Sequence, residues 1–255
     1  MSSYSQLVDE VLGIVNTLRT SPADFANQLE RVLADYKPNN ARHRKGDVPV
    51  MTREGRAAVE EALSVLRSIE TMDPLEVSLG LSNAAQAHVD DTGSQGIVGH
   101  IGSKENTLQN RLEEFGSWSE CIAEALDYGS IEAFEIVSSL FIDDGLTTRP
   151  HRNALINPRF KKIGVGVGPH SEFKTVTCIV FAGDFSEKPE VEPIPPPGGE
   201  IASIPEVEGW LEGAIKLTCE IRSETDGART VKKVKKYWEM SDGSTQVTED
   251  IIDGK

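Results

Sequence analysis

The hydrophobic positions in the first part of the chain recur at spacings of three and four residues, the period of an α-helix. Over residues 4–36 the positions that follow this spacing are Leu7, Val11, Ile14, Val15 and Leu18, and then Phe25, Leu29, Val32 and Leu33. The pattern restarts at Ser21 and Pro22, where a serine suits the N-cap and a proline suits the first helical position. The sequence therefore predicts two consecutive helices.

Three later segments show the same helical spacing. The first begins after Thr52, which we interpret as its N-cap, the second lies around residues 81–88, and the third covers residues 131–142. Their apolar faces consist of Val59, Leu63, Leu66 and Ile69, then Leu81, Ala84 and Ala85, then Phe134, Val137 and Phe141. Residues 91–107 are rich in glycine and serine and predict a loop.

Two segments near the middle of the chain indicate β-strands. Residues 163–168 alternate Ile or Val with Gly, and residues 175–181 are rich in β-branched side chains. The glycines lack the G-x-G-x-x-G spacing of a dinucleotide loop. They are better suited to a strand against which another stretch of backbone packs closely.

The last quarter of the chain has a different pattern. Prolines concentrate in residues 187–205 and predict an extended linker. Beyond it, apolar and polar residues alternate over 215–222, and the pairs Asp226-Gly227 and Asp242-Gly243 are typical of hairpin turns. We therefore expect one domain over residues 1–186, the linker, and a small β-rich appendage over 206–255 that forms a three-stranded meander.

Composition narrows the classes of partner and compartment. The formal net charge of −15 disfavours nucleic acid and anionic membrane surfaces as general partners. No apolar run is long enough for a transmembrane helix. The chain has three cysteines, and its first residues lack the pattern of a secretory signal. We expect a cytoplasmic protein that is not secreted, unless a signal peptide has been removed.

One short segment is basic although the chain as a whole is negatively charged. Arg42, Arg44 and Lys45 lie in a polar loop, which is either a solvated loop or a docking site for an acidic protein partner. In the appendage, Trp210 and Trp238 are candidate anchors against another surface. Protein partners are therefore expected.

Four segments place a polar side chain that can ligate a metal beside a glycine or a helix end. They contain His100, Glu120, the pair Asp143 and Asp144, and His151. Two imidazoles and two carboxylates can bind a divalent cation if the fold brings them together. Spacing alone leaves the alternative that each histidine is a hydrogen-bonded structural residue.

Several motifs together resemble the CAP superfamily, which comprises cysteine-rich secretory, antigen 5 and pathogenesis-related 1 proteins. The resemblance covers about residues 8–185 and includes Asn16 with Arg19, residues 74–77, Gly99 with His100, Arg111 with Leu112, and residues 163–167. The block from Ile142 to Arg152 is similar to a CAP subgroup common in unicellular eukaryotes.

The resemblance implies an α+β fold, an α/β/α three-layer sandwich with an open cleft. In the family this cleft contains two histidines and two acidic residues. The match assigns His100, Glu120 and His151 to it, with Asp143 or Asp144 as the fourth. It also implies weak binding of zinc or magnesium, and some family members bind sterols or fatty acids.

We therefore expect a non-catalytic binding module that contacts proteins in a larger assembly, such as a cytoskeletal or ciliary one. The alternatives are a metal, lipid or sterol binding protein and, as a third hypothesis, a metal-assisted hydrolase with Glu120 as base. A Cys121 nucleophile is disfavoured because the neighbouring Glu120 charge would raise the pKa of its thiol.

Overall fold

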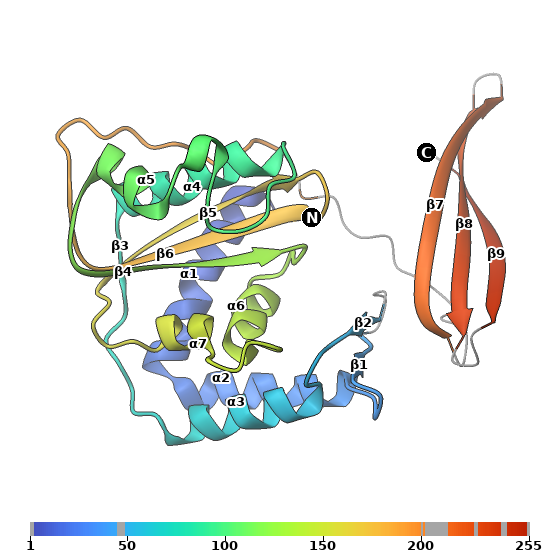
Figure 1. Cartoon of the computed structure of the whole chain (residues 1–255), viewed down its shortest axis with the longest axis horizontal. Helices are drawn as coiled ribbons and strands as arrows, with labels where there is room; N and C mark the ends of the chain where they lie inside the picture. The colour runs from blue at the N-terminus through green and yellow to red at the C-terminus, as the bar shows by residue number, and fades with distance from the viewer. Residues whose placement is uncertain are drawn as a thin grey trace. The chain divides into compact units, whose positions relative to one another are not determined.

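The computed structural model describes residues 3–44, 49–199, 201, 214–226, 229–240 and 244–253 (Figure 1). The chain divides into two compact units. The first comprises Met1–Leu33 and Arg56–Ser203, and the second comprises Ala34–Gly55 and Ile204–Lys255.

The first unit is built on a four-stranded sheet in the order β3-β5-β6-β4. Its strands are β3 (Glu76–Val77), β4 (Gly116–Tyr128), β5 (Lys162–His170) and β6 (Lys174–Glu187). The short strand β3 pairs parallel to β5, whereas the other pairs are antiparallel. The strand β4 is therefore at one edge of the sheet.

Helices cover both faces of this sheet, which gives three layers (Figure 1). On one face lie α4 (Leu79–Gly93) and α5 (Leu108–Phe115). The other side carries α1 (Tyr4–Thr20), α2 (Pro22–Val32), α3 (Arg56–Ser68), α6 (Ala133–Ile142) and α7 (Pro150–Leu155). The expected α+β, three-layer α/β/α architecture is confirmed.

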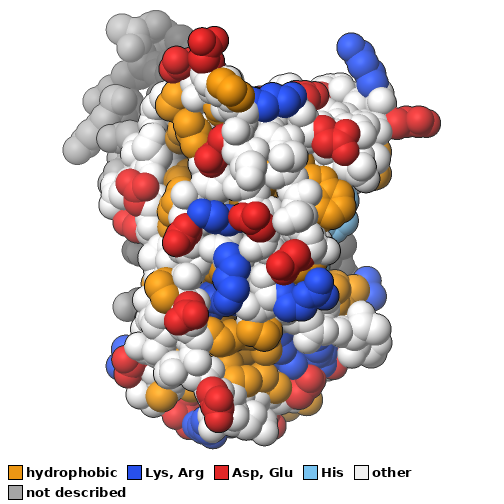
Figure 2. Space-filling model, turned by 90° about the vertical axis from the view of Figure 1, so that its left-hand side faces the viewer, with side chains coloured by type: hydrophobic (Ala, Val, Ile, Leu, Met, Phe, Trp, Pro, Cys, Tyr) orange, Lys and Arg blue, Asp and Glu red, His pale blue; other side chains and the backbone are white. Residues whose placement is uncertain are grey.

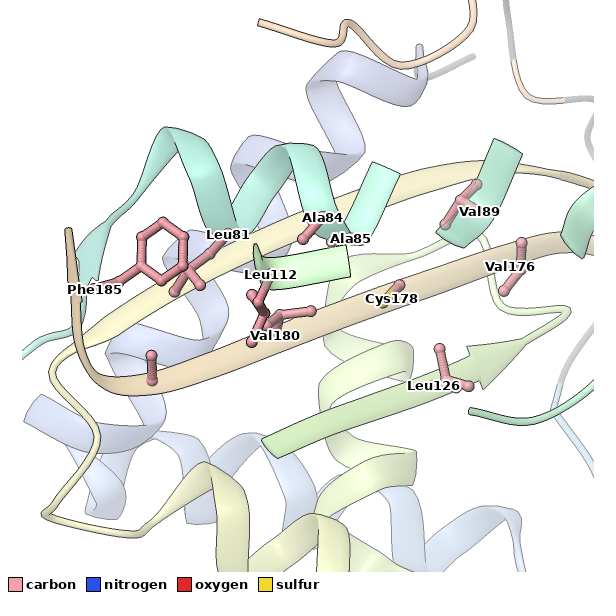
Figure 3. Packing of buried hydrophobic residues seen from close by; sticks show 11 residues of the cluster. Leu81, Ala84, Ala85, Val89, Leu112, Leu126, Val176, Cys178, Val180 and Phe185 are labelled. Carbon is pink, nitrogen blue, oxygen red and sulfur yellow. The ribbon is translucent and has the colours of Figure 1, made fainter. Parts of the chain in front are cut away.

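The helix α4 lies very close to strand β5. A Cβ atom added to Gly164 would come within 2.2 Å of the Leu81 backbone, and one added to Gly166 within 2.5 Å of the Gln86 nitrogen. This confirms the close backbone packing expected from the glycines. Around this contact, apolar side chains of α4, α5, β4 and β6 form a buried cluster (Figure 3).

The predicted helices are present, but two of their caps differ from expectation. Ser21 precedes α2 as predicted, yet its side chain makes no capping hydrogen bond. Thr52 does not cap α3, which begins at Arg56. Its hydroxyl instead donates to the Asn40 carbonyl over 2.6 Å, so the side chain closes the loop rather than starting the helix.

The proline-rich segment begins along the first unit. The side chain of Asn83 on α4 donates to the Glu192 carbonyl over 2.7 Å and accepts from the Ile194 amide over 2.8 Å. The Lys188 ammonium donates to the carbonyl of Glu113. Residues 188–194 therefore lie against this unit, with a turn at residues 189–190. The domain boundaries expected from the sequence stay a prediction.

The second unit contains two antiparallel sheets. The strands β1 (Ala41–Arg42) and β2 (Val50–Met51) form a short pair. The strands β7 (Ala214–Asp226), β8 (Arg229–Met240) and β9 (Thr245–Asp253) follow one another in a three-stranded sheet. The predicted C-terminal meander is thus confirmed.

No helix in the described part of the chain is both long and apolar enough to cross a membrane. On the face shown in Figure 2, acidic, basic and hydrophobic side chains lie interspersed. The net negative charge is therefore not gathered into a single patch on that face.

Candidate functional site

The two candidate histidines meet beside the edge strand β4. His100 lies in the loop between α4 and α5, and His151 lies in the first turn of α7. Their ring centroids are 6.5 Å apart. Because α5 and α7 cover opposite faces of the sheet (Figure 1), the pair is assembled from two different layers.

The loop that bears His100 is fixed at several points. The Asp91 carboxylate on α4 accepts from the backbone and hydroxyl of Ser103, over 2.7 and 2.5 Å. The amide of Gly99 donates to the Tyr128 hydroxyl over 2.9 Å, and the Gly99 carbonyl lies 3.0 Å from Nε2 of the buried His88. The carbonyl oxygen can only accept, so Nε2 of His88 donates this bond, and burial lowers the pKa of His88.

The imidazole of His100 is oriented by Glu124. Its Nδ1 lies 2.9 Å from Oε1 of Glu124, whereas the ring itself is 53% exposed. Glu124 is a buried carboxylate on β4, with a side chain only 2% exposed. Its second oxygen pairs with the Arg111 guanidinium and accepts from the Cys178 thiol over 3.3 Å.

The electrostatics of this buried group are set by its neighbours. Burial acts to raise the pKa of Glu124. The hydrogen bond from His100 and the charge of Arg111 act in the opposite direction and outweigh it, so the pKa is lowered overall. Burial and the Glu124 charge together raise the pKa of the Cys178 thiol well above its usual value. A buried thiol with a raised pKa suits a structural role better than that of a nucleophile, and Cys178 is fully buried.

The imidazole of His151 is oriented by Asp143 in the same manner. Asp143 follows α6 in the left-handed conformation, with φ of 57°. One carboxylate oxygen lies 2.8 Å from Nδ1 of His151. The other accepts from the backbone amides of His151 and Arg152, over 2.9 and 3.3 Å. Asp143 therefore both caps the start of α7 and fixes the ring.

Each histidine thus uses Nδ1 to bind a buried carboxylate, which leaves Nε2 without a hydrogen bond to any described residue. This is the arrangement in which an outer carboxylate orients an imidazole ligand of a metal. Imidazole nitrogen suits zinc and related transition metals rather than magnesium.

The donor set is limited to these two rings. No group of three or more His, Cys, Asp or Glu side chains that could hold a metal ion occurs within the ranges that the structure describes. Glu124 and Asp143 face the Nδ1 atoms and orient the rings. The residues therefore fit a site with two protein ligands, and metal binding stays a prediction.

Three of the five residues expected at this site come together, namely His100, Asp143 and His151. Glu120 is an exposed residue in a bulge of β4, with φ of 67°, where the pairing with β6 is interrupted between Ser119 and Ile122. Glu124, four residues later on β4, is the carboxylate that contacts His100, and the assignment of Glu120 stays a prediction. Asp144 is half-buried beside Asp143, and it is Asp143 that contacts His151.

The sequence around Glu124 contains a pattern that indicates its burial. Residues Ile122, Leu126 and Tyr128, which alternate along β4, are packed against the cluster of α4 and α5. Glu124 shares their side of the strand, so a charged residue in an apolar alternation marks a buried ion pair. The sequence pattern predicts no strand over residues 116–128, because the polar residues at Ser117, Ser119 and Glu120 interrupt the start of the alternation.

Three of the five candidate partner-binding residues, Arg42, Arg44 and Trp238, lie within the described part of the chain. Arg42 lies 3.8 Å from the Asp35 carboxylate, and its guanidinium lies over the Tyr36 ring. Arg44 is half-buried. Trp238 is 1% exposed, and its indole donates to Thr248 over 2.9 Å. Lys45 and Trp210 lie outside the described residues.

Two hollows in the first unit lie away from the histidines. One, of about 440 Å³, is lined by α1 and the start of α6, including Ile14 and Phe134. The other, of about 770 Å³, lies where α1 passes into α2 and near the end of α3. Neither is lined by His100 or His151, so the open cleft expected at the histidines is not one of these hollows.

Comparisons with known proteins found one family model and two similar solved structures. Residues 60–180 match the model of the cysteine-rich secretory protein family, CAP. An outer surface protein from Borrelia burgdorferi is similar at 21% identity over 46% of this chain and 80% of that chain, with a TM-score of 0.36. No curated protein matches the chain significantly.

An extracellular protein containing a SCP domain from Bacillus anthracis str. Ames is similar at 16% identity and a TM-score of 0.35. That match covers 50% of this chain and 37% of the length of that protein. The family match and the layered fold support the CAP superfamily. The subgroup of unicellular eukaryotes stays a prediction.

Proposed function

We propose, taking residues 60–180 as a CAP domain, that the chain is a non-catalytic binding protein whose site holds a divalent transition metal between His100 and His151. The observation that supports this most directly is the paired geometry of the two rings. Each ring has Nδ1 bonded to a buried carboxylate, each has Nε2 unbonded among the described residues, and the centroids are 6.5 Å apart.

The expected affinity for zinc follows from the number of protein side chains that can coordinate the ion. Zinc binds imidazole nitrogen at about 2.0–2.1 Å and prefers four ligands in a structural site. With two protein ligands, the remaining positions are left to water, so binding is weak and reversible. Zinc therefore suits this site better than magnesium, which prefers oxygen ligands.

Binding without turnover is favoured because neither carboxylate that orients a histidine is free to act as a base. A general base must be within hydrogen-bond reach of the proton it removes. Both oxygens of Glu124 and both oxygens of Asp143 are already engaged. Glu120 lies in the bulge of β4 and has no hydrogen bond that ties it to either histidine within the described residues.

Calorimetric titration with zinc tests this function. We expect the wild-type chain to bind one ion and the double variant His100→Ala, His151→Ala to bind none. The matched control is His43→Ala, which removes an imidazole from the second unit and should leave binding unchanged. Equal zinc uptake by the wild type and the double variant would refute the proposal, as would no uptake by the wild type.

A second candidate function is protein contact through the C-terminal sheet. β7 and β9 are the outer strands of their sheet, and Val247 on β9 is half-exposed. An outer strand can accept a strand from a partner. We include in this proposal an intracellular location, in a cytoskeletal or ciliary assembly.

Tagging the protein in its native cell tests this second candidate. We expect it to co-sediment with the cytoskeletal or ciliary fraction, and a chain that ends before β7 to lose this association. Recovery of the tagged protein from the medium would contradict the intracellular location. Unchanged association of the shortened chain would contradict the role of the sheet.

A further inference from the structure

A carboxylate on a distant helix is connected to both arginines that flank His151. This residue is Glu61, on α3, and its partners are Arg149 and Arg152. We propose that Glu61 is a positioning residue for His151 and that it acts through these two arginines. The proposal rests on the proposed function in so far as it treats His151 as a ligand.

Arg149 connects Glu61 to the turn that bears Asp143. Its guanidinium donates to Oε2 of Glu61 over 2.5 and 3.2 Å. A third nitrogen donates to the backbone carbonyls of Asp143 and Leu146, over 2.8 and 3.3 Å. Arg149 therefore fixes the backbone of the residue whose side chain orients the imidazole.

Arg152 connects the same carboxylate to the end of α6. It donates to Oε1 of Glu61 over 2.7 Å, and to the carbonyls of Phe141 and Ile142 over 2.7 and 2.9 Å. The last carbonyls of a helix have no partner within the helix, and a cation near them is favourable. Arg152 therefore fixes the point at which the chain leaves α6 for Asp143.

The charges explain why Glu61 is needed. The side chains of Arg149 and Arg152 are almost fully buried, whereas that of Glu61 is 47% exposed. The hydrogen bond from Arg149, followed by that from Arg152 and both positive charges, lowers the pKa of Glu61 despite its partial burial. Without its charge, two buried guanidinium groups would lack their shared anion.

Asp143, the residue that orients the imidazole, also contacts both arginines. The Asp143 carboxylate already accepts from the Arg152 amide, and the Asp143 carbonyl accepts from Arg149. Loss of the Glu61 charge would draw the guanidinium groups towards Asp143, which would then bind Nδ1 of His151 less well. Arg149 also adopts a left-handed conformation, with φ of 48°, which surrounding contacts must maintain.

The test compares Glu61→Gln with Glu60→Gln. Glu60 is the preceding residue of α3, and its ion pair is with Arg56 on the exposed surface. The first readout is the nitrogen NMR signal of the His151 imidazole in metal-free protein, which reports its tautomer and the bond to Asp143. The second readout is zinc affinity.

We expect Glu61→Gln to weaken or remove the signal of the His151 Nδ1–H bond while that of His100 is unchanged. Zinc affinity should fall about tenfold, the lower end of the effect of changing groups that orient a ligand. Glu60→Gln should match the wild type in both readouts. An unchanged His151 signal in folded Glu61→Gln would overturn the proposal.

The two proposals fail separately. If the wild type binds no zinc, the proposed function fails, whereas the NMR comparison still decides the role of Glu61. If Glu61→Gln does not fold, Glu61→Asp replaces it, because it retains the charge but shortens the reach to the arginines. A partial change in the His151 signal then supports the proposal, and no change overturns it.

Discussion

The imidazoles of His100 and His151 lie 6.5 Å apart, measured between ring centroids, although they come from opposite sides of the central sheet. Their supports are alike, since each Nδ1 meets a buried carboxylate. The carboxylates differ in origin, because Glu124 belongs to the edge strand and Asp143 to the turn after α6. This difference allows the two halves of the site to be perturbed separately.

Replacement of Asp143 by Asn tests the half that bears His151. Asparagine tolerates the left-handed conformation, so the backbone should be retained. It cannot accept from both the imidazole and the two backbone amides. We expect a loss of about 1–2 kcal/mol in the free energy of unfolding and a 10–100-fold loss of zinc affinity.

Urea unfolding and zinc titration measure these effects, with Asp144→Asn as the comparison. Asp144 is the other aspartate that the sequence offered, and its replacement should change zinc affinity much less. A larger effect from Asp144 than from Asp143 would reverse the assignment of the orienting carboxylate.

Removal of the Arg111 side chain tests the other half. The guanidinium is buried against Glu124 and also donates to the Asn106 carbonyl over 2.9 Å. Arg111→Ala leaves a buried carboxylate without its counter-charge, which typically costs about 3–5 kcal/mol. Urea unfolding measures this loss. Arg56→Ala, which breaks an exposed pair with Glu60, should cost about 0.5 kcal/mol or less.

A different buried carboxyl predicts how stability varies with pH. Burial raises the pKa of Asp127, against hydrogen bonds from Ser139 and Ser130 that lower it. The pKa of Asp127 is higher in the folded state than in the unfolded state. Protonation of Asp127 therefore favours the folded state, and this contribution to the free energy of unfolding is present in full at low pH. It is lost as the pH rises through the folded-state pKa.

We therefore compare Asp127→Asn with the wild type by urea unfolding at a series of pH values. The variant carries no charge at this position at any of them. Its stability relative to the wild type should rise as the pH increases from about 4 towards neutrality. A relative stability that falls over this range would show that the buried carboxyl is preferentially ionised.

Two glycine substitutions test the contact between α4 and β5. A Cβ atom at Gly166 would lie 2.5 Å from the backbone nitrogen of Gln86, so Gly166→Ala should cost about 1–3 kcal/mol or more. At Gly13 on α1 a Cβ atom meets nothing within 4 Å. Gly13→Ala should therefore stabilise the helix, by about 0.5–1 kcal/mol. Equal effects, measured by thermal unfolding, would contradict this packing.

The helical apolar period predicts most of the helices. Glycine alternation, β-branched content and Asp-Gly turn pairs predict the strands β5 to β9. Pairing of His100 with His151 was predicted from the family resemblance, since spacing alone left the alternative of structural histidines. Periodicity cannot report which distant segments become neighbours. That information resides in the order of strands in the sheet, which places β4 at the edge.

The bulge in β4 bears on the assignment of Glu120, which stays a prediction. An extra residue between Ser119 and Ile122 changes which side chains face each layer. A motif read by position alone does not record such an insertion. The predicted N-cap at Thr52 was wrong for a different reason. The Thr52 hydroxyl donates to the Asn40 carbonyl, a contact between two loop residues that helical spacing does not indicate.

The two-layer origin of the site has a consequence for cleaved chains. A cut between β4 and α6 would leave His100 and Glu124 on the N-terminal fragment and His151 and Asp143 on the C-terminal one. Neither fragment alone would contain both imidazoles. Zinc uptake by a mixture of the two fragments would therefore report reassembly of the sandwich.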